Sequence, residues 1–251
     1  MSSMKFLSCF LDNRDRGREE QEAGAPLPVL NLPVFTYQPI ADGANIRVLT
    51  VTPGQSTDPL AGELSDVALA SVRNNYVTLS YCWGSEDATH EITCNAQALK
   101  ITPALEFALC HIRHPTQPVR LWIDQICINQ KDNQEKGQQV QLMSLIYRNA
   151  ARVIIWLGLE DMYTQAAIKM INRLASVFEW LKDYGNFFGT TDTVPANALV
   201  RMTGRKMKAN RLPRRTNKGW QALLHLLSRP WFSRVWVVQE AVVATFSLGK
   251  P

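Results

Sequence analysis

Three short apolar runs alternate with segments of helical periodicity between residues 76 and 158, and no other feature constrains the fold as strongly. The runs are YVTLSYCWG, VRLWID and ARVIIWLG, and the last two are almost continuously apolar. Strands that lack polar/apolar alternation are buried on both faces, as happens where helices cover both sides of a parallel sheet. We therefore expect an α/β fold with a mainly parallel sheet flanked by helices on both faces.

The helices expected around these strands have recognisable beginnings and apolar faces. Thr102 and Pro103 read as an N-cap followed by proline at the first helical position. Apolar residues then recur every three to four positions, and the same periodicity returns three more times. The predicted helices cover residues 103–112, 133–150, 162–185 and 220–227.

Further segments flank this pattern at both ends. VFTYQPI (34–40) and NIRVLTVTPG (45–54) are strand-like and bounded by turn signals, which predicts an N-terminal β-rich extension. SDVALASV (65–72) fits either a short helix or extended chain. RVWVVQEAVVA (234–244) fits a strand by its valines and a helix by its spacing. We favour the helix, followed by a final strand in TFSLG (245–249).

Composition excludes several classes of protein. Hydrophobic residues make up 46% and charged residues 20%, as in soluble globular domains, and no apolar run approaches the ~18–20 residues that span a bilayer. Residues 1–27 have mixed charge and few apolar groups, which predicts a disordered tail rather than a signal peptide. The five cysteines lack a CxxC pair and the four histidines lack ligand spacing beside them. We therefore expect reduced thiols, no metal site and a cytoplasmic protein.

Residues 201–218 carry eight basic residues and no acidic one, in a chain of net charge +5. Such a stretch could contact nucleic acid, a membrane surface or an import receptor. It lacks the interleaved aromatic residues of a single-strand binder, and we favour a solvated insertion loop. We expect no membrane partner, while nucleic-acid binding and nuclear import stay open through this stretch alone.

Polar side chains gather where two of the predicted buried strands end. Ser80, Tyr81, Trp83 and Gly84 follow the first strand, and DQICINQ (124–130) follows the second. In parallel sheets ligands bind beyond the carboxyl ends of the strands. The sequence therefore indicates a site formed by these two segments.

The residues that carry these features also resemble a known family. YVTLSYCWG, LWIDQICINQKDNQEKGQQVQLMSLIYRNAARVIIWLG and RPWFSRVWVVQEAV together resemble the fungal heterokaryon incompatibility (HET) domain. FTYQPI…NIRVLTVTPG looks like the segment that commonly precedes it. The resemblance covers roughly residues 35–245. It implies a HET domain over 28–249, with a core of 76–160 and 218–249 and a helical, basic insertion over 161–217.

The resemblance implies a fungal protein of self/non-self recognition, associated with cell death and acting with other incompatibility proteins or by self-association. HET domains are also similar to Toll/interleukin-receptor (TIR) domains, which have a flavodoxin-like α/β fold and some of which cleave NAD. LSYCWG resembles the first TIR strand and its loop, and WIDQICINQ resembles the second. WFSRVWVVQE resembles the segment in which a tryptophan precedes the catalytic glutamate, which places Glu240 at that position.

On this resemblance NAD is a candidate substrate and no tightly bound cofactor is expected. Breaking its N-glycosidic bond passes through an oxocarbenium-like transition state, which the Glu240 carboxylate would stabilise. Tryptophans would stack on the rings, and polar groups and an arginine would hold the ribose and pyrophosphate. The predicted binding residues are Ser80, Tyr81, Trp83, Gly84, Asp124, Asn129, Gln130, Arg234 and Trp236.

Most of these residue types also have a structural interpretation. Glu240 could be a solvated helix residue, and the tryptophans could be core or interface anchors. Asp124 could cap a turn, and Asn129 and Gln130 could serve turn chemistry alone. Two departures from TIR domains weaken the enzymatic analogy, namely Gln239 before the glutamate and a longer middle region. The alternative function is a non-enzymatic signalling or oligomerisation module.

Overall fold

The structure, a computed structural model, describes residues 32–41, 43–84, 87–187, 212–214 and 216–235, and for residues 177–187 the backbone alone. The predicted tail, most of the basic stretch and the segment after Val235 lie outside the described residues. These residues fall into two compact units, which divide between Gly158 and Leu159 and again between Ser233 and Arg234.

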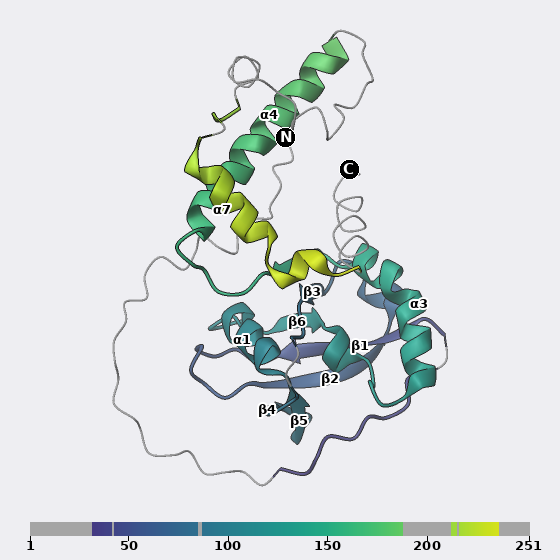
Figure 1. The fold of residues 1–251 in the computed structure, drawn as a ribbon. Helices are drawn as coiled ribbons and strands as arrows, with labels where there is room; N and C mark the ends of the chain where they lie inside the picture. The colour runs from purple at the N-terminus through teal and green to yellow at the C-terminus, as the bar shows by residue number, and fades with distance from the viewer. Residues whose placement is uncertain (1–31, 42, 85–86, 188–211, 215, 236–251) are drawn as a thin grey trace, which may run out of the picture. The chain divides into compact units, whose positions relative to one another are not determined.

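The first unit is built on a seven-stranded sheet with the order β5-β4-β2-β1-β6-β3-β7 (Figure 1). The pairs β3–β6, β3–β7 and β2–β4 are parallel, while β1–β2, β1–β6 and β4–β5 are antiparallel. The expected α/β class is confirmed, and the sheet is mixed. Its strands are β1 Asn45–Val51, β2 Ala61–Ala68, β3 Val77–Tyr81, β4 His90–Cys94, β5 Gln97–Ile101, β6 Val119–Trp122 and β7 Arg152–Trp156.

Helices cover both faces of this sheet. Trp156 and Trp122 lie opposite β3 positions three residues apart, so their side chains point to opposite faces. Trp156 lies 5.2 Å from the ring of His111 in α1 (Pro103–Ile112), and Trp122 lies 5.8 Å from the ring of Tyr147 in α3 (Asn133–Asn149). The two helices therefore pack on opposite faces, as the apolar strands predict.

The predicted helices are confirmed where the structure describes them. Thr102 accepts a hydrogen bond from the Leu105 amide, and Pro103 is the first residue of α1. The long helix α4 covers Thr164–Phe187, and α7 covers Lys218–Leu227. Both belong to the second unit, where they lie side by side (Figure 1). Pro230–Ser233 then form the short 3₁₀ helix η3, and the helix predicted over 234–244 lies mostly outside the described residues.

The prediction for the N-terminal extension is confirmed in part, since NIRVLTVTPG contains β1 but VFTYQPI does not form the expected strand. VFTYQPI is not a strand, because its backbone pairs with the sheet as an isolated bridge between Val34 and Ala98 at the edge strand β5. SDVALASV is divided between the end of β2 and a 3₁₀ turn over Leu69–Val72, so each of its two interpretations holds for one half.

The hairpin of β4 and β5 has no prediction in the sequence, because its turn is unusual. Asn95 and Ala96 both adopt positive φ, at 50° and 60°, in a position where Asn-Gly is the common signal. The Asn95 side chain compensates, since it accepts a hydrogen bond from the Leu64 amide and donates one to the Leu64 carbonyl. The turn is thereby attached to β2.

The core lies between the sheet and its helices. Trp122, Tyr76 and Tyr81 are the largest side chains that are fully buried. Burial of such a side chain stabilises the fold by about 1.5–3 kcal/mol. Among the described residues, no helix is both long enough and apolar enough to cross a membrane.

Candidate functional site

The carboxyl ends of β3, β6 and β7 meet at one edge of the sheet because these strands are parallel. The chain leaves β6 directly into α2, a single helical turn over Asp124–Cys127. It leaves β3 through Cys82, Trp83 and Gly84. The two segments that the sequence singled out therefore lie at the same edge.

A direct contact joins these two segments. The indole N–H of Trp83 donates to both carboxylate oxygens of Asp124, at 3.0 and 3.1 Å. The backbone N–H of Gln125 donates to Asp124 Oδ1 at 2.8 Å, and the side-chain Nε2 of Gln130 donates to the Asp124 carbonyl at 2.8 Å. Hydrogen bonds to Asp124 thus bring Trp83 and Gln130 together.

Tyr81 lies at the end of the strand that leads into this group. Its side chain is buried, and its hydroxyl makes no hydrogen bond of ordinary geometry among the described residues. Burial raises the pKa of Tyr81 well above its ordinary value, the Asp124 charge raises it further, and Arg234 opposes them. The charge of Arg234 therefore acts on this strand end. A buried hydroxyl, a carboxylate and a guanidinium therefore share this region.

Three of the predicted residues have other surroundings. Ser80 is buried one position before Tyr81, so strand alternation points it to the other face of β3. Gly84 is exposed and has φ of 76°, a conformation that favours glycine. Asn129 Oδ1 accepts from the Lys131 amide at 3.2 Å, which is local turn chemistry. Trp236 and the predicted catalytic Glu240 lie outside the described residues.

Gln125 is a member of this group that the sequence did not single out. Its Oε1 accepts from both the amide and the hydroxyl of Thr102, each at 3.3 Å. Thr102 is also the N-cap of α1, so Gln125 links α2 to the beginning of α1. The only available signal was its place after Asp124 within a polar segment.

The first unit also contains a cavity that lies apart from the predicted site residues. A cavity of about 460 Å³ opens elsewhere in the first unit, and none of the predicted site residues lines it. In the part of the chain that the structure describes, no group of histidine, cysteine and carboxylate side chains is arranged to hold a metal ion. Burial raises the pKa of Cys127 to about 12, so this thiol is protonated at neutral pH.

Comparison with known proteins identifies relatives. The model of the family "Heterokaryon incompatibility protein (HET)" matches residues 76–240. The chain is 31% identical over 233 residues to heterokaryon incompatibility protein 6, OR allele, of Neurospora crassa, and the match covers 82% of this chain and 33% of that protein. The chain thus spans about a third of the length of this relative. No solved structure matches it.

Proposed function

The chain belongs to the heterokaryon incompatibility (HET) family, and on that premise we propose that it is a self/non-self recognition module that triggers cell death by hydrolysing NAD. The reaction is NAD plus water giving nicotinamide, ADP-ribose and a proton. Incompatibility is the role that the family and its Neurospora relative carry in their names. Cell death and NAD cleavage are our extension of that role.

The observation that carries the proposal is the group of Trp83, Asp124 and Gln130 at the carboxyl ends of parallel strands. Ligands of open α/β sheets bind at such edges. An aromatic ring, a carboxylate and an amide are suited to a ribose and its attached base. The nearby cation of Arg234 is suited to a pyrophosphate.

Glu240 supplies the chemistry in this proposal. Nicotinamide leaves as a neutral molecule, so its departure requires no general acid. A carboxylate beside the ribose stabilises the positive charge that develops as the N-glycosidic bond breaks. Water then attacks the same carbon and loses its proton. The assignment of Glu240 rests on the TIR-like sequence around it, since this position lies outside the described residues.

A nicotinamide-release assay tests the proposal. The full chain, concentrated to favour assembly, is incubated with NAD, and nicotinamide is separated and quantified. We expect release by the wild type and a loss of about a hundredfold or more in Glu240→Gln, because the charge is removed while size is kept. Glu160→Gln is the matched control, since Glu160 is exposed and its carboxylate contacts Gln165. Equal rates in the wild type and Glu240→Gln would contradict the catalytic assignment.

A second candidate function is a non-enzymatic signalling module that uses the same surface. One observation favours it: the Asp124 carboxylate already accepts hydrogen bonds from Trp83 and Gln125 within the fold. That arrangement also suits a structural wall of a protein-binding surface. Under this alternative, the wild-type chain and its Glu240→Gln variant kill cells equally well when expressed in a fungal host, and neither releases nicotinamide.

A further inference from the structure

We infer that the N-terminal segment of residues 35–47 positions the site segment, residues 124–130, through Tyr37 and Arg47. Both residues precede the region that the family model matches, which begins at residue 76. The link from this positioning to catalysis rests on the proposed function. The positioning itself rests on contacts within the first unit.

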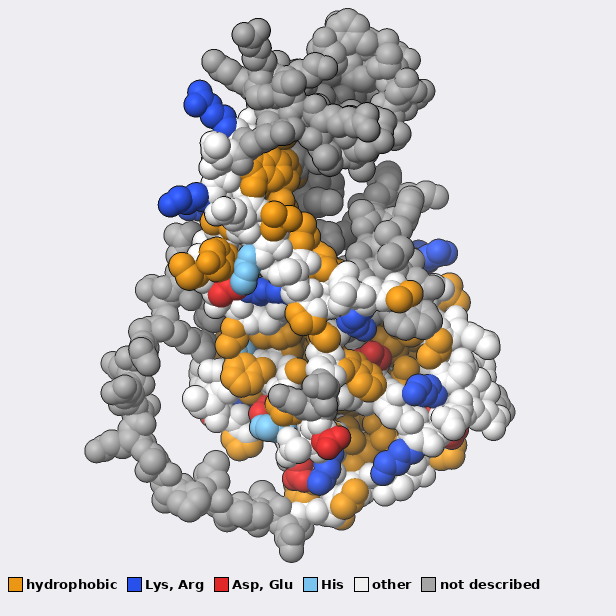
Figure 2. Space-filling model, in the orientation of Figure 1, with side chains coloured by type: hydrophobic (Ala, Val, Ile, Leu, Met, Phe, Trp, Pro, Cys, Tyr) orange, Lys and Arg blue, Asp and Glu red, His pale blue; other side chains and the backbone are white. Residues whose placement is uncertain are grey.

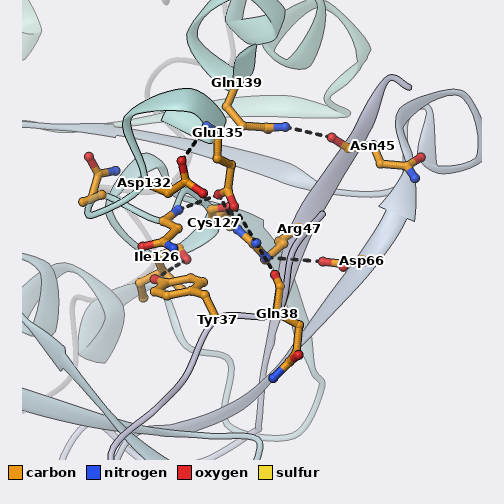
Figure 3. A network of polar contacts seen from close by, with 12 residues as sticks. Tyr37, Gln38, Asn45, Arg47, Asp66, Ile126, Cys127, Asp132, Glu135 and Gln139 are labelled. Carbon is orange, nitrogen blue, oxygen red and sulfur yellow. Dashed lines mark hydrogen bonds and ion pairs between the residues drawn. The ribbon is translucent and has the colours of Figure 1, made fainter. Parts of the chain in front are cut away.

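The first contacts hold the end of α2. A helix leaves its last carbonyls without partners in the helix. At α2, the Tyr37 hydroxyl donates to the Ile126 carbonyl at 2.8 Å, and Arg47 Nη1 donates to the Cys127 carbonyl at 3.2 Å. Figure 3 shows Tyr37 and Arg47 directed toward these two carbonyls from outside the segment. Two donors from the N-terminal segment therefore hold consecutive carbonyls of the site segment.

A buried ion pair holds the segment at a third point. Arg47 Nη1 and Nη2 donate to the two carboxylate oxygens of Glu135 at 2.6 and 2.9 Å. Glu135 Oε1 also accepts from the backbone N–H of Asn129 at 2.7 Å. Arg47 is 3% exposed and Glu135 8%, so water cannot replace either partner without a rearrangement. The backbone of residues 126–129 is thus held from one side.

The geometry requires an arginine. Arg47 also donates to the Gln38 carbonyl at 2.7 Å and lies 4.9 Å from the centre of the Tyr37 ring. Burial would lower the pKa of Arg47, but hydrogen bonds to Glu135 and its charge outweigh burial and hold the pKa above its ordinary value. The ammonium of lysine has no planar fork, so it cannot make these contacts together.

These contacts reach the site through one helical turn. α2 begins at Asp124, which holds the Trp83 indole, and ends at Cys127, which Arg47 holds. The turn is about 6 Å long at 1.5 Å per residue, so a shift at its end reaches its beginning. Arg47 does not contact the proposed ligand, and it acts as a positioning residue for Asp124 and Trp83.

The test follows Trp83 by ¹⁹F NMR in the full chain labelled with 5-fluorotryptophan, with the signal assigned by Trp83→Phe. Arg47→Lys and Tyr37→Phe should each shift this signal, and the Asn129 amide should exchange with solvent about tenfold faster or more. The matched control is Arg113→Lys. Arg113 is also buried, and it donates to the carbonyls of Gln55, Asp58 and Pro59 in another loop.

The outcomes separate this inference from the proposed function. An unchanged Trp83 signal in folded Tyr37→Phe, or an equal shift in Arg113→Lys, would overturn the positioning role, even if Arg47→Lys fails to fold. If the wild type releases nicotinamide, Arg47→Lys should lower kcat while Arg113→Lys retains it. If the wild type releases none, the enzymatic proposal fails, and the Trp83 signal alone decides the positioning role.

Discussion

Two charged clusters join distant parts of the chain, and they differ in their access to water. The Arg47 cluster (Arg47, Glu135 and Asp66) lies in the first unit, and its arginine and glutamate are buried. The Asp161 cluster (Asp161, His225 and Arg229) lies in the second unit, and the side chain of Asp161 is 35% exposed. Similar ion pairs therefore have different consequences, because water can replace a lost partner of Asp161 but not of the buried pair Arg47 and Glu135.

The Asp161 cluster connects the beginning of α4 to the end of α7. Arg229 Nη2 lies 2.9 Å and His225 Nε2 3.0 Å from Asp161 Oδ2. Asp161 Oδ1 accepts from the amides of Tyr163 and Thr164, each at 2.9 Å, before the first turn of α4. Hydrophobic side chains gather over these two helices on the face drawn in Figure 2, and Met162 and Leu224 are 84% and 68% exposed. The Asp161 cluster and its hydrophobic neighbours are thus more accessible to water than the buried pair Arg47 and Glu135.

The largest expected effect is at the centre of the buried cluster. Arg47→Met leaves the Glu135 carboxylate buried without its cation, so we expect the free energy of unfolding to fall by about 3–5 kcal/mol in urea denaturation. Adding Glu135→Gln removes the stranded charge while its side-chain oxygen can still accept from Asn129, so the double variant should regain part of the loss. A loss below about 1 kcal/mol in Arg47→Met would mean that this cluster behaves like a surface pair.

Elements of the fold with local sequence signals could be predicted, and elements held by non-local pairing could not. Helices α1, α3 and α7 and strands β3, β6 and β7 were predictable because their signals are local: periodicity, apolar runs and the Thr102 cap. The β4–β5 hairpin was not, because its Asn95-Ala96 turn lacks glycine. The first half of β2, residues 61–64, was missed because it is held by pairing with β1 and carries little apolar alternation of its own.

The candidate site likewise has a part that the sequence predicts and a part that it does not. The approach of Trp83 to Asp124 was predictable, since parallel strands bring their carboxyl ends to one edge. Arg47 was not predictable, because its partner Glu135 is 88 positions away and both look like surface residues of an amphipathic pattern. Non-local polar pairing leaves no periodic signal, so the residues that hold the site were less visible than the residues that line it.

Helix caps give a second, smaller contrast. Asp132 accepts from the amides of Gln134 and Glu135 at the start of α3, so it also orients the buried carboxylate. Asn217 accepts from the backbone amide of Gly219 at the start of α7; both caps are exposed, but the Gly219 amide does not belong to a buried charged residue. We expect Asp132→Ala to lower stability by about 1–2 kcal/mol and Asn217→Ala by about 0.5 kcal/mol, by urea denaturation. A larger loss at Asn217 would contradict the greater dependence of the first unit on its caps.

A substitution in the exposed Asp161 cluster should change the structure only near the start of α4. The hydrogen bond from Arg229 lowers the pKa of Asp161 well below its ordinary value, against an opposing effect of desolvation and with help from Thr164. The stability that the ionised Asp161 carboxylate contributes is therefore present above the ordinary carboxyl pKa and is lost only as pH falls through the lowered pKa. At pH 7, Asp161→Asn should speed amide exchange at Thr164 without moving the urea midpoint of the first unit. A shift of that midpoint as large as in Arg47→Met would show that exposure does not decide the difference.

The smallest effect is expected at Asp66, which tests whether burial or cluster membership decides. Asp66 Oδ1 lies 3.4 Å from Arg47 Nε, but its side chain is 38% exposed. Partial burial raises the pKa of Asp66, Arg47 opposes this and the Glu135 charge adds to it. A raised pKa means that the contribution of Asp66 to stability is full below the ordinary carboxyl pKa and falls as pH rises through the raised value. Asp66→Asn should therefore leave the urea midpoint unchanged or slightly higher at pH 7, and the difference should disappear at acid pH. A clear loss at pH 7 would mean that Asp66 shares the role of Glu135, and that the rim of the buried cluster is as important to it as its centre.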